Sequence, residues 1–351
     1  MSRVALLTPY AAPVPGGIST FVRGLAELLD LHGDEVFLFA AEGNGDHIRR
    51  SNLGFGRAFV ARATRGLEEL RPDVIHCHSH WYALAASVRY ARRHPGTRLV
   101  FSFHTTSVPF LKVPFVRLLN QAHVTTFVSS AQQAHIRFTL RLAGDLRIFR
   151  PATNVPKADP DEMNQWASRL TLERAFPILV FVGPLEYEKK VAGVIDLVRA
   201  FVDVRARYPE ARLLIVGDGS LRSSVQRAAS AFADSVTITG FLDNPALAMA
   251  RADIYCQVTR QEGLPIAMLE AMSMGRCVIG SRVGGIPEVL DGTNGLIVGW
   301  KPAEIARVIC ELLENRQRRN ALGQSARRTI ERFYTWESRI PLLASMYALE
   351  R

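Results

Sequence analysis

Residues 262–270 read Glu262-Gly-Leu-Pro-Ile-Ala-Met-Leu-Glu270, and this stretch decides the fold. A short apolar run, Ala252–Val258, precedes it, and a second run, Cys277–Ser281, follows it. Apolar runs of this length on both sides of a helical segment predict two buried parallel strands joined by a helix. Pro265 suits the first turn of that helix, because its missing N–H would have no partner there. The sequence therefore predicts a βαβ unit with the first glutamate in the loop before the helix and the second inside the helix.

The start of this predicted helix carries groups that suit a phosphorylated sugar. The first N–H groups of a helix have no partner inside the helix, so they form a ready site for a phosphate. Carboxylates accept hydrogen bonds from hydroxyl groups, and one glutamate lies on each side of the helix start. Donors for phosphate beside acceptors for hydroxyls predict a nucleotide-sugar site. The alternative is an ordinary βαβ unit in which both glutamates are merely solvated.

Short apolar runs alternate with helical patterns along the whole chain, which is typical of α/β proteins with parallel sheets. In the first half we predict strands at residues 4–8, 35–41, 73–78, 98–104, 124–129 and 146–150. In the second half we predict strands at residues 177–182, 211–216, 236–239, 254–258, 278–280 and 296–298. The pattern indicates two Rossmann-like halves.

The 351 residues suffice for two domains. We predict an N-terminal domain at 1–155, a linker at 156–174 and a C-terminal domain at 175–335. The linker contains Pro156 and Pro160 and lacks a strong core pattern, and the tail 336–351 is expected to be helical. Asp159-Pro160-Asp161, the only D-x-D sequence, is interpreted as a turn in this linker.

The composition is that of a folded protein, with 48% hydrophobic and 22% charged residues. No apolar stretch reaches the roughly 18–20 residues that span a bilayer, and the N-terminus lacks the layout of a signal peptide. The four cysteines are scattered within apolar runs, so we expect buried thiols in a reducing compartment. These features predict a cytoplasmic protein.

The net charge of +10 is concentrated in the N-terminal half, where residues 1–150 hold 18 basic and 10 acidic residues. A basic half could attract an anionic membrane or an anionic acceptor, which leaves peripheral contact with the inner membrane face open. The alternative is that the many arginines only reflect genome composition. No nucleic-acid motif is present, so we expect no nucleic-acid partner.

Further glycine-rich turns follow the helix. Val283-Gly-Gly-Ile-Pro-Glu-Val289 is followed by Asp291-Gly-Thr-Asn-Gly-Leu-Ile-Val298. Together with the first stretch, this run resembles the donor-binding signature of the retaining GT-B-fold glycosyltransferases of family 4, also called glycosyl transferases group 1. The resemblance is specific over residues 250–300 and looser over nearly the whole chain.

The resemblance implies an α/β fold of the GT-B type, with two doubly wound Rossmann-like domains facing a central cleft. It implies that the N-terminal domain takes the acceptor, that the second domain binds the donor, and that the tail packs back on the first domain. It also implies that Glu270 holds the ribose hydroxyls and Glu262 the hydroxyls of the donor sugar. The loop between them is expected to bind the donor through Gly263, Leu264, Pro265, Ile266 and Ala267.

The segment Gly183-Pro-Leu-Glu-Tyr-Glu-Lys189 resembles the G-R-x-x-x-x-K segment of the same family, whose Arg and Lys grip the donor diphosphate. Lys189 matches, whereas Pro184 stands in place of the arginine. We consider Lys190 or Arg260 as a substitute for the missing cation. The alternative interpretation of Lys189 is an ordinary surface lysine.

Other motifs are expected at the carboxyl ends of strands, where doubly wound folds bind ligands. Gly16 and Gly17 form a turn whose backbone a ligand can approach closely, and Ser19 or Thr20 can cap the helix that follows. By resemblance, this turn faces the donor phosphate and the acceptor. The loops at Gly217 and at Phe241 and Leu242 resemble those that bracket the nucleobase.

His104 ends the fourth predicted strand and matches the family histidine near the sugar and the acceptor. A buried structural histidine is the alternative. His76, His78 and His80 alternate, so they are expected to share one face of a strand. This spacing could hold a metal, but we favour a role in shaping the acceptor pocket.

The segment Phe110–Arg117 is apolar and basic, and it is interpreted either as a membrane contact or, with slight preference, as the start of a core helix.

Together with the resemblance, which implies a retaining and metal-independent mechanism, these observations predict a hexosyltransferase with no cofactor, whose substrates are a nucleoside-diphosphate sugar, with UDP favoured, and a hydroxyl acceptor. The catalytic residues would be His104, Glu262 and Lys189. A nucleotide-sugar epimerase or phosphorylase on the same fold and a non-catalytic nucleotide-sugar binder remain as alternatives. A nicotinamide-linked dehydrogenase is disfavoured, because no G-x-G-x-x-G follows the first strand.

Overall fold

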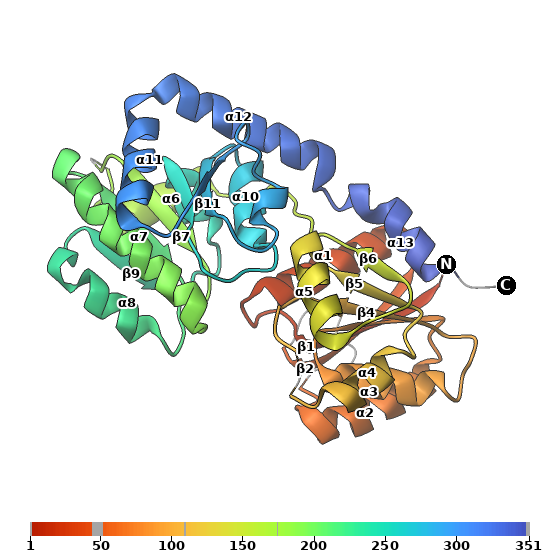
Figure 1. Cartoon of the computed structure of the whole chain (residues 1–351). Helices are drawn as coiled ribbons and strands as arrows, with labels where there is room; N and C mark the ends of the chain where they lie inside the picture. The colour runs from red at the N-terminus through yellow and green to blue at the C-terminus, as the bar shows by residue number, and fades with distance from the viewer. Residues whose placement is uncertain (1, 44–51, 109, 174, 349–351) are drawn as a thin grey trace. The chain divides into compact units, whose positions relative to one another are not determined.

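The computed structural model describes residues 2–43, 52–108, 110–173 and 175–348. The chain divides into two compact units (Figure 1). The first unit comprises the residues up to Ala152 together with those from Trp336 onward, and the second comprises Thr153–Thr335. Each unit holds its own sheet and its own apolar core.

The first unit is built on a six-stranded sheet in the order β2-β1-β3-β4-β5-β6, in which all pairs are parallel. Its strands are β1 (Arg3–Tyr10), β2 (Glu35–Glu42), β3 (Val74–His78), β4 (Arg98–Phe103), β5 (Val124–Phe127) and β6 (Leu146–Ile148). Its helices are α1 (Gly17–Leu31), α2 (Gly56–Leu70), α3 (Trp81–Ala91), α4 (Lys112–Leu119), α5 (Ser130–Leu140), η3 (Glu337–Arg339) and α13 (Ile340–Tyr347). Right-handed crossovers place α1 on one face of the sheet and the helices α2 to α5 on the other, whereas Trp336 packs on α1.

The second unit is also built on a parallel six-stranded sheet, in the order β12-β11-β10-β7-β8-β9. Its strands are β7 (Ile178–Val182), β8 (Arg212–Val216), β9 (Val236–Gly240), β10 (Ile254–Gln257), β11 (Cys277–Ser281) and β12 (Leu296–Val298). Its helices are α6 (Pro160–Arg169), α7 (Glu188–Arg207), α8 (Arg222–Ala229), η1 (Ser230–Phe232), α9 (Ala246–Arg251), α10 (Ile266–Ser273), η2 (Ile286–Glu288), α11 (Pro302–Glu314) and α12 (Arg316–Phe333). Val194, Val225 and Ile305 bring α7, α8 and α11 into one core against the sheet.

The strands follow the predicted apolar runs, and the α/β class with two parallel sheets is confirmed. The interpretation of Asp159-Pro160-Asp161 as a turn was wrong. Asp159 is the N-cap of α6, and its Oδ1 accepts hydrogen bonds from the N–H groups of Asp161 and Glu162 at 3.0 Å. Pro160 occupies the first helical position, where no N–H is needed, so the motif begins a helix.

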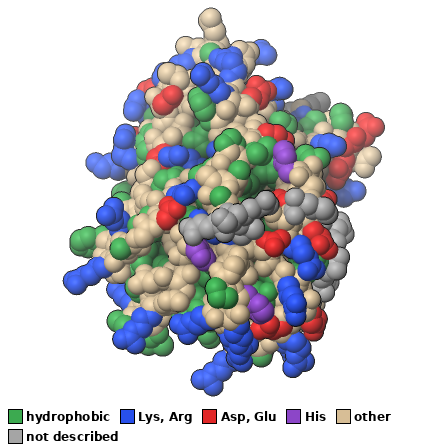
Figure 2. Space-filling view, turned by 90° about the vertical axis from the view of Figure 1, so that its right-hand side faces the viewer, with side chains coloured by type: hydrophobic (Ala, Val, Ile, Leu, Met, Phe, Trp, Pro, Cys, Tyr) green, Lys and Arg blue, Asp and Glu red, His purple; other side chains and the backbone are tan. Residues whose placement is uncertain are grey.

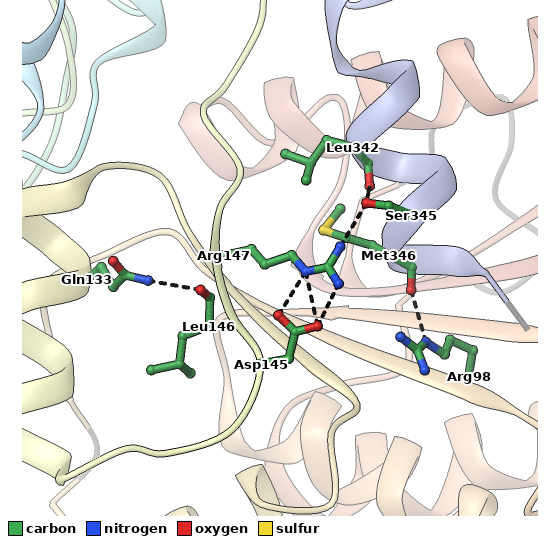
Figure 3. Close-up of polar contacts among 8 residues, drawn as sticks. All are labelled: Arg98, Gln133, Asp145, Leu146, Arg147, Leu342, Ser345 and Met346. Carbon is green, nitrogen blue, oxygen red and sulfur yellow. Dashed lines mark hydrogen bonds and ion pairs between the residues drawn. The ribbon is translucent and has the colours of Figure 1, made fainter. Parts of the chain in front are cut away.

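The C-terminal segment is held on the first unit by polar contacts with two strands (Figure 3). Arg98 of β4 donates to the carbonyl oxygen of Met346 at 3.0 Å. Arg147 of β6 donates to Ser345 Oγ at 2.7 Å and is itself paired with Asp145. The Trp336 ring packs edge-on against Phe21 of α1, with 5.4 Å between ring centroids. The segment is therefore joined to the first unit both by hydrogen bonds and by aromatic packing.

All four cysteines are free thiols with buried side chains, as predicted. Burial raises the pKa of Cys77 to about 12. Among the described residues, no helix combines the length and the apolar character needed to cross a bilayer. On the face that Figure 2 shows, Lys and Arg side chains are spread around the surface, with Asp and Glu between them toward the right-hand side.

Candidate active site

The strand order of the second unit defines where a ligand binds. The chain leaves β7 toward β8 and β9 on one side and returns to β10 and β11 on the other. Ligands of open α/β sheets bind at the carboxyl ends of the strands, at the point where the strand order reverses. That point lies between β7 and β10, so the loops beginning at Gly183 and Val258 frame the candidate site.

The loop from β10 to α10 is supported from behind by a second glycine turn. Gly284 has φ +54°, and a Cβ atom there would overlap the carbonyl oxygen of Glu262. The N–H of Gly285 donates to the carbonyl oxygen of Gly263 at 2.6 Å. The turn therefore packs directly on the backbone that carries the first glutamate, and only glycine permits so close an approach.

The loop after β7 is supported in the same way by the loop after β8. The N–H of Gly183 donates to the carbonyl oxygen of Val216 at 3.0 Å, and the N–H of Leu185 donates to that of Asp218 at 2.8 Å. A Cβ atom at Gly217 would overlap the carbonyl oxygen of Gly183. Of the glycines predicted to bind the donor, Gly183 and Gly217 thus lie in contacting loops.

Glu262 lies in the loop before α10, as predicted, and it forms a close ion pair. Its Oε2 lies 2.8 Å from Nζ of Lys190 at the start of α7, and each side chain is only 14% exposed. Its Oε1 accepts a hydrogen bond of 3.3 Å from the N–H of Gly263. The carboxylate is therefore held in place on the wall of the site, largely shielded from bulk water.

Glu270 lies inside α10, as predicted. Both carboxylates act on one buried phenol, that of Tyr255 on β10. Burial raises the pKa of Tyr255 well above its usual value, and the charges of Glu270 and Glu262 raise it further. The structure therefore brings the two glutamates together around Tyr255, a residue whose role the sequence did not suggest.

Helix α10 begins one residue later than predicted. It runs over Ile266–Ser273, and Pro265 is its N-cap with φ −75° and ψ 118°, just before the first turn. No side chain caps this helix start. Gly263, Leu264, Pro265 and Ile266 are buried, and Ala267 is half-buried. The N–H groups of the first turn have no partner within the helix, so the predicted phosphate donors are present.

The two candidate substitutes for the missing arginine have different partners. Arg260 donates from Nε and Nη2 to Oδ2 of Asp196 on α7, at 2.9 and 2.7 Å. Asp196 is almost fully buried, and its pairing with Arg260 was not predicted, although it is the one acid in the apolar run Val191–Val198. Lys190, by contrast, contacts the carboxylate of Glu262, while Lys189 is exposed.

The loops expected near the nucleobase lie further along the same edge of the sheet. Phe241 and Leu242 directly follow β9, and Phe241 is exposed. Asp218, after β8, forms an ion pair of 2.8 Å with Arg222 at the start of α8. These residues therefore line the β8–β9 side of the sheet edge.

In the first unit, Gly16 is the N-cap of α1, and Gly17 is its first residue. The expectation that Ser19 or Thr20 caps this helix was wrong, because the helix begins earlier, at Gly17. Ser19 instead lies in the first turn, and its hydroxyl donates to the carbonyl oxygens of Val14 and Gly16 at 2.5 and 3.0 Å. The hydroxyl therefore closes the glycine turn from inside the helix.

His104 directly follows β4 and is half-buried. Its Nε2 lies 3.0 Å from Nδ1 of His78, and the ring of Phe21 packs edge-on against it at 4.6 Å. Burial lowers the pKa of His104 to about 3. The histidine is therefore neutral, and it is held by another ring rather than by a carboxylate.

The prediction that His76, His78 and His80 share one face was wrong for His80. The rings of His76 and His78 stack at 4.4 Å on β3. Ser79 then adopts a left-handed conformation with φ 63°, which turns the chain, and the His80 ring stacks on Tyr82 instead. Within the residues that the structure describes, no group of three or more His, Cys, Asp or Glu side chains is arranged to hold a metal.

Comparisons with known proteins agree with this geometry. Residues 176–315 match the family profile of glycosyl transferases group 1, and residues 15–155 match that of glycosyltransferase family 4. The chain is 30% identical over 295 residues to the GDP-mannose-dependent alpha-(1-6)-phosphatidylinositol monomannoside mannosyltransferase of Mycolicibacterium smegmatis, covering 77% of this chain and 76% of that protein. It is 26% identical to a GDP-mannose-dependent monoacylated alpha-(1-6)-phosphatidylinositol monomannoside mannosyltransferase of Corynebacterium glutamicum, with 95% of each chain covered.

Solved structures show the same fold at lower identity. Sucrose-phosphate synthase from Thermosynechococcus elongatus superposes with a TM-score of 0.79 at 20% identity, covering 99% of this chain and 98% of that one. Anabaena HepE in complex with UDP-glucose superposes with a TM-score of 0.80 at 17% identity, covering 98% and 99%.

Two parallel Rossmann-like units with a carboxylate pair at the switch point of the second define a GT-B glycosyltransferase that uses a nucleotide sugar. Within that class, the chain belongs to the family 4 glycosyltransferases, the glycosyl transferases group 1.

Proposed function

We propose that this enzyme transfers a hexose from a nucleoside-diphosphate sugar to a hydroxyl acceptor with retention of the anomeric configuration. The observation that carries the proposal is the Lys190–Glu262 pair next to the uncapped start of α10, at the switch point of the sheet. This arrangement combines a fixed acceptor for sugar hydroxyls with donors for a diphosphate.

Each group has a defined role in the proposed reaction. The bond between the anomeric carbon and the diphosphate oxygen breaks, and its electron pair leaves with the diphosphate. The N–H groups at the start of α10 and the Lys189 ammonium stabilise the negative charge that develops there. Glu270 accepts hydrogen bonds from the ribose hydroxyls, and Glu262 accepts them from the sugar. The acceptor hydroxyl attacks from the face that the diphosphate leaves and gives its proton to the departing phosphate.

This mechanism uses no bound metal, because the N–H groups at the start of α10 and the Lys189 ammonium supply the positive charge. We therefore expect full transferase activity in the presence of EDTA. Activity that disappears with EDTA and returns with Mg²⁺ or Mn²⁺ would contradict metal independence without affecting the assignment of the carboxylates.

UDP- and GDP-sugars are the two donor candidates. The sequence favours UDP, and HepE was solved with UDP-glucose, whereas the named sequence relatives depend on GDP-mannose. Melting curves with UDP, GDP, ADP and TDP separate these possibilities, because a ligand that binds only the folded chain raises the melting temperature. The nucleotide that gives the largest shift then selects the sugar donors for the transfer assay.

NMR of the first-formed product tests retention. An α-linked donor should give an α-linked product, and a β-linked product would exclude retention. Release of free sugar or sugar phosphate without an acceptor would favour an epimerase or phosphorylase. Tight nucleotide binding with no turnover on any acceptor would favour a non-catalytic binder.

We further propose that the acceptor is carried by a membrane lipid and that the first unit docks on the membrane. Phe110, Leu111 and Val113 are exposed, Phe110 by 98%, next to the basic residue Lys112 at the start of α4, and a second basic residue, Arg117, lies in the last turn of this helix. Phe115 and Leu119 bury the opposite side of this helix, so the expected core helix also presents an apolar and basic tip. The named relatives act on phosphatidylinositol mannosides, which supports a lipid-borne acceptor.

Co-sedimentation with anionic and zwitterionic vesicles tests the docking surface. We expect binding to phosphatidylglycerol vesicles and its loss in a Phe110→Ser, Leu111→Ser double variant. Phe138→Ser is the matched control, because Phe138 is 87% exposed on a different helix, α5. Equal vesicle binding by the double variant and the control would contradict the proposal.

A further inference from the structure

Three histidines of the first unit form a continuous contact chain with buried hydroxyl groups. His76 and His78 have no exposed surface, and their rings stack at 4.4 Å. His76 Nδ1 lies 2.7 Å from the hydroxyl of Tyr347, and His76 Nε2 lies 2.6 Å from Ser102 Oγ. His78 Nδ1 lies 3.0 Å from His104 Nε2. This chain of contacts thus runs from Tyr347 of the C-terminal helix α13 to His104, which directly follows β4.

The buried Nε2 atom of His78 determines which ring nitrogens in this chain of contacts carry the protons. His78 Nε2 is buried and has no hydrogen-bond partner among the described residues. A buried N–H without a partner is rarer and more costly than a buried lone pair without one. The proton of His78 therefore lies on Nδ1, where it has His104 Nε2 as its acceptor.

We propose that His78 is a positioning residue that holds His104 in the tautomer with its proton on Nδ1. Since His104 Nε2 accepts the hydrogen bond from His78, the proton of a neutral His104 must lie on Nδ1. His104 then offers one N–H donor at the carboxyl end of β4, and it has no free basic nitrogen. In the proposed reaction, on which this role rests, His104 donates a hydrogen bond to a hydroxyl or phosphate oxygen and takes up no proton.

The same geometry opposes protonation of His104. A charged His104 would carry a proton on Nε2, so His78 Nδ1 would have to become the acceptor. The proton of His78 would then move to Nε2, which is buried and has no partner. Consistent with this, burial lowers the pKa of His104 to about 3.

The aromatic rings around His78 and His104 hold both imidazole rings in one orientation. Phe21 packs edge-on against both His104 and His78, at 4.6 and 5.9 Å, and Trp336 packs against Phe21. On the other side, His76 stacks on His78 and is fixed at both nitrogens by Tyr347 and Ser102. The C-terminal segment, through Trp336 and Tyr347, therefore helps to orient His104.

NMR of protein labelled with ¹⁵N-histidine tests the tautomer directly. We expect long-range ¹H–¹⁵N spectra to show His78 and His104 neutral and protonated at Nδ1, with assignments from His78→Leu and His104→Gln. A proton on Nε2 of His104, or a doubly protonated His104 at pH 6, would overturn the proposal. This readout is independent of catalysis, so it stands even if the enzyme transfers no sugar.

Kinetics of His78 variants test the positioning role. Asparagine can place its side-chain N–H near the position of Nδ1, whereas leucine has no donor. We expect His78→Leu to lower kcat about tenfold or more with little change in donor KM, and His78→Asn to recover most of it. His135→Leu, on the exposed side of α5, is the control and should behave as the wild type.

Two outcomes would overturn the positioning role. One is a His78→Leu enzyme with wild-type kcat. The other is a folded His78→Asn enzyme that is no better than a folded His78→Leu enzyme. If His78→Leu does not fold, His78→Gln replaces it, because glutamine places its N–H near the Nε2 position. Equal kcat for His78→Asn and His78→Gln would then contradict the proposal.

Discussion

At the scale of single residues, the two glutamates of the proposed donor site differ in how they are held. Glu262 is paired with Lys190 and shielded, whereas Glu270 lies half-exposed within α10. A carboxylate that must bind a sugar hydroxyl in one geometry benefits from an ion pair that limits its rotamers. We therefore expect Glu262 to govern the chemical step and Glu270 to govern nucleotide binding.

Glu262→Ala should lower kcat by about 100-fold or more while the fold is retained, because a preorganised acceptor is lost. Glu270→Gln should instead raise the nucleotide Kd by about tenfold, because a charge-assisted hydrogen bond becomes a neutral one. Steady-state kinetics and calorimetry measure the two effects. Glu314→Ala, at an exposed ion pair on α11, is the control. Near-normal turnover of Glu262→Ala would refute the assignment.

Substitutions of Lys190 and of Arg260 should have different effects, although both residues neighbour the site. Lys190→Met should lower kcat about tenfold, because Glu262 loses its ion pair. Arg260→Met should mainly lower stability, on the order of 1–2 kcal/mol, because the buried Asp196 loses its main partner while the half-exposed arginine is partly screened. Urea denaturation and donor kinetics separate the effects. A large rise in donor KM for Arg260→Met would identify it instead as the missing diphosphate cation.

The buried histidines predict a loss of stability in acid. Burial lowers the pKa of His76 to about 3 and that of His78 well below its usual value. In the unfolded chain both histidines have a pKa of about 6.5, so the unfolded state binds more protons than the folded state below that pH. The contribution of these two histidines to the free energy of unfolding is therefore complete above about pH 6.5, and it decreases as the pH falls below that value.

At pH 5 each of these two histidines should cost on the order of 2 kcal/mol of the free energy of unfolding. Urea denaturation at pH 7 and pH 5 measures the loss. His78→Asn should lose less stability than the wild type between these two pH values, because asparagine does not titrate. An identical loss of stability in both proteins would show that His78 does not contribute to the destabilisation in acid.

At the scale of elements, the site depends on loops that pack backbone against backbone. The turn at Gly284 contacts the carbonyl groups of Glu262 and Gly263, so the position of the first glutamate depends on a residue more than twenty positions away in sequence. The local pattern Val-Gly-Gly predicted a turn, but which backbone it supports follows from β10 lying next to β11.

Gly284→Ala should displace the Glu262 loop, because the new Cβ would overlap the Glu262 carbonyl oxygen and alanine is strained at φ +54°. We expect weaker donor binding and a free energy of unfolding lowered by about 1–3 kcal/mol. Gly96→Ala is the control, since a Cβ atom there meets nothing within 4 Å. Unchanged donor affinity in Gly284→Ala would show that the loop tolerates the shift.

At the scale of the whole molecule, the chain returns at its end to the unit in which it began. Trp336, Met346 and Tyr347 contact α1, β4 and β3 respectively. The last residues thus complete the core of the first unit and reach the histidine chain, whereas the second unit is a continuous segment.

Trp336→Ala should therefore destabilise the first unit by about 3–5 kcal/mol, the usual cost of removing a large buried aromatic side chain. It should also lower kcat through the loosened packing of Phe21 on His104. Hydrogen exchange resolves which unit loses protection. Loss of protection confined to residues of the second unit would contradict this role of the segment.

The sequence by itself determined the α/β class, the strand positions and the loop-to-helix placement of Glu262 and Glu270. These follow from local periodicity and from the proline and glycine residues at element ends, which act over a few residues. Only the tertiary structure decided that Lys190 pairs with Glu262, that Arg260 pairs with Asp196 and that His78 holds His104. Such pairs join residues that are far apart along the chain, and the order of strands within each sheet determines which of them meet.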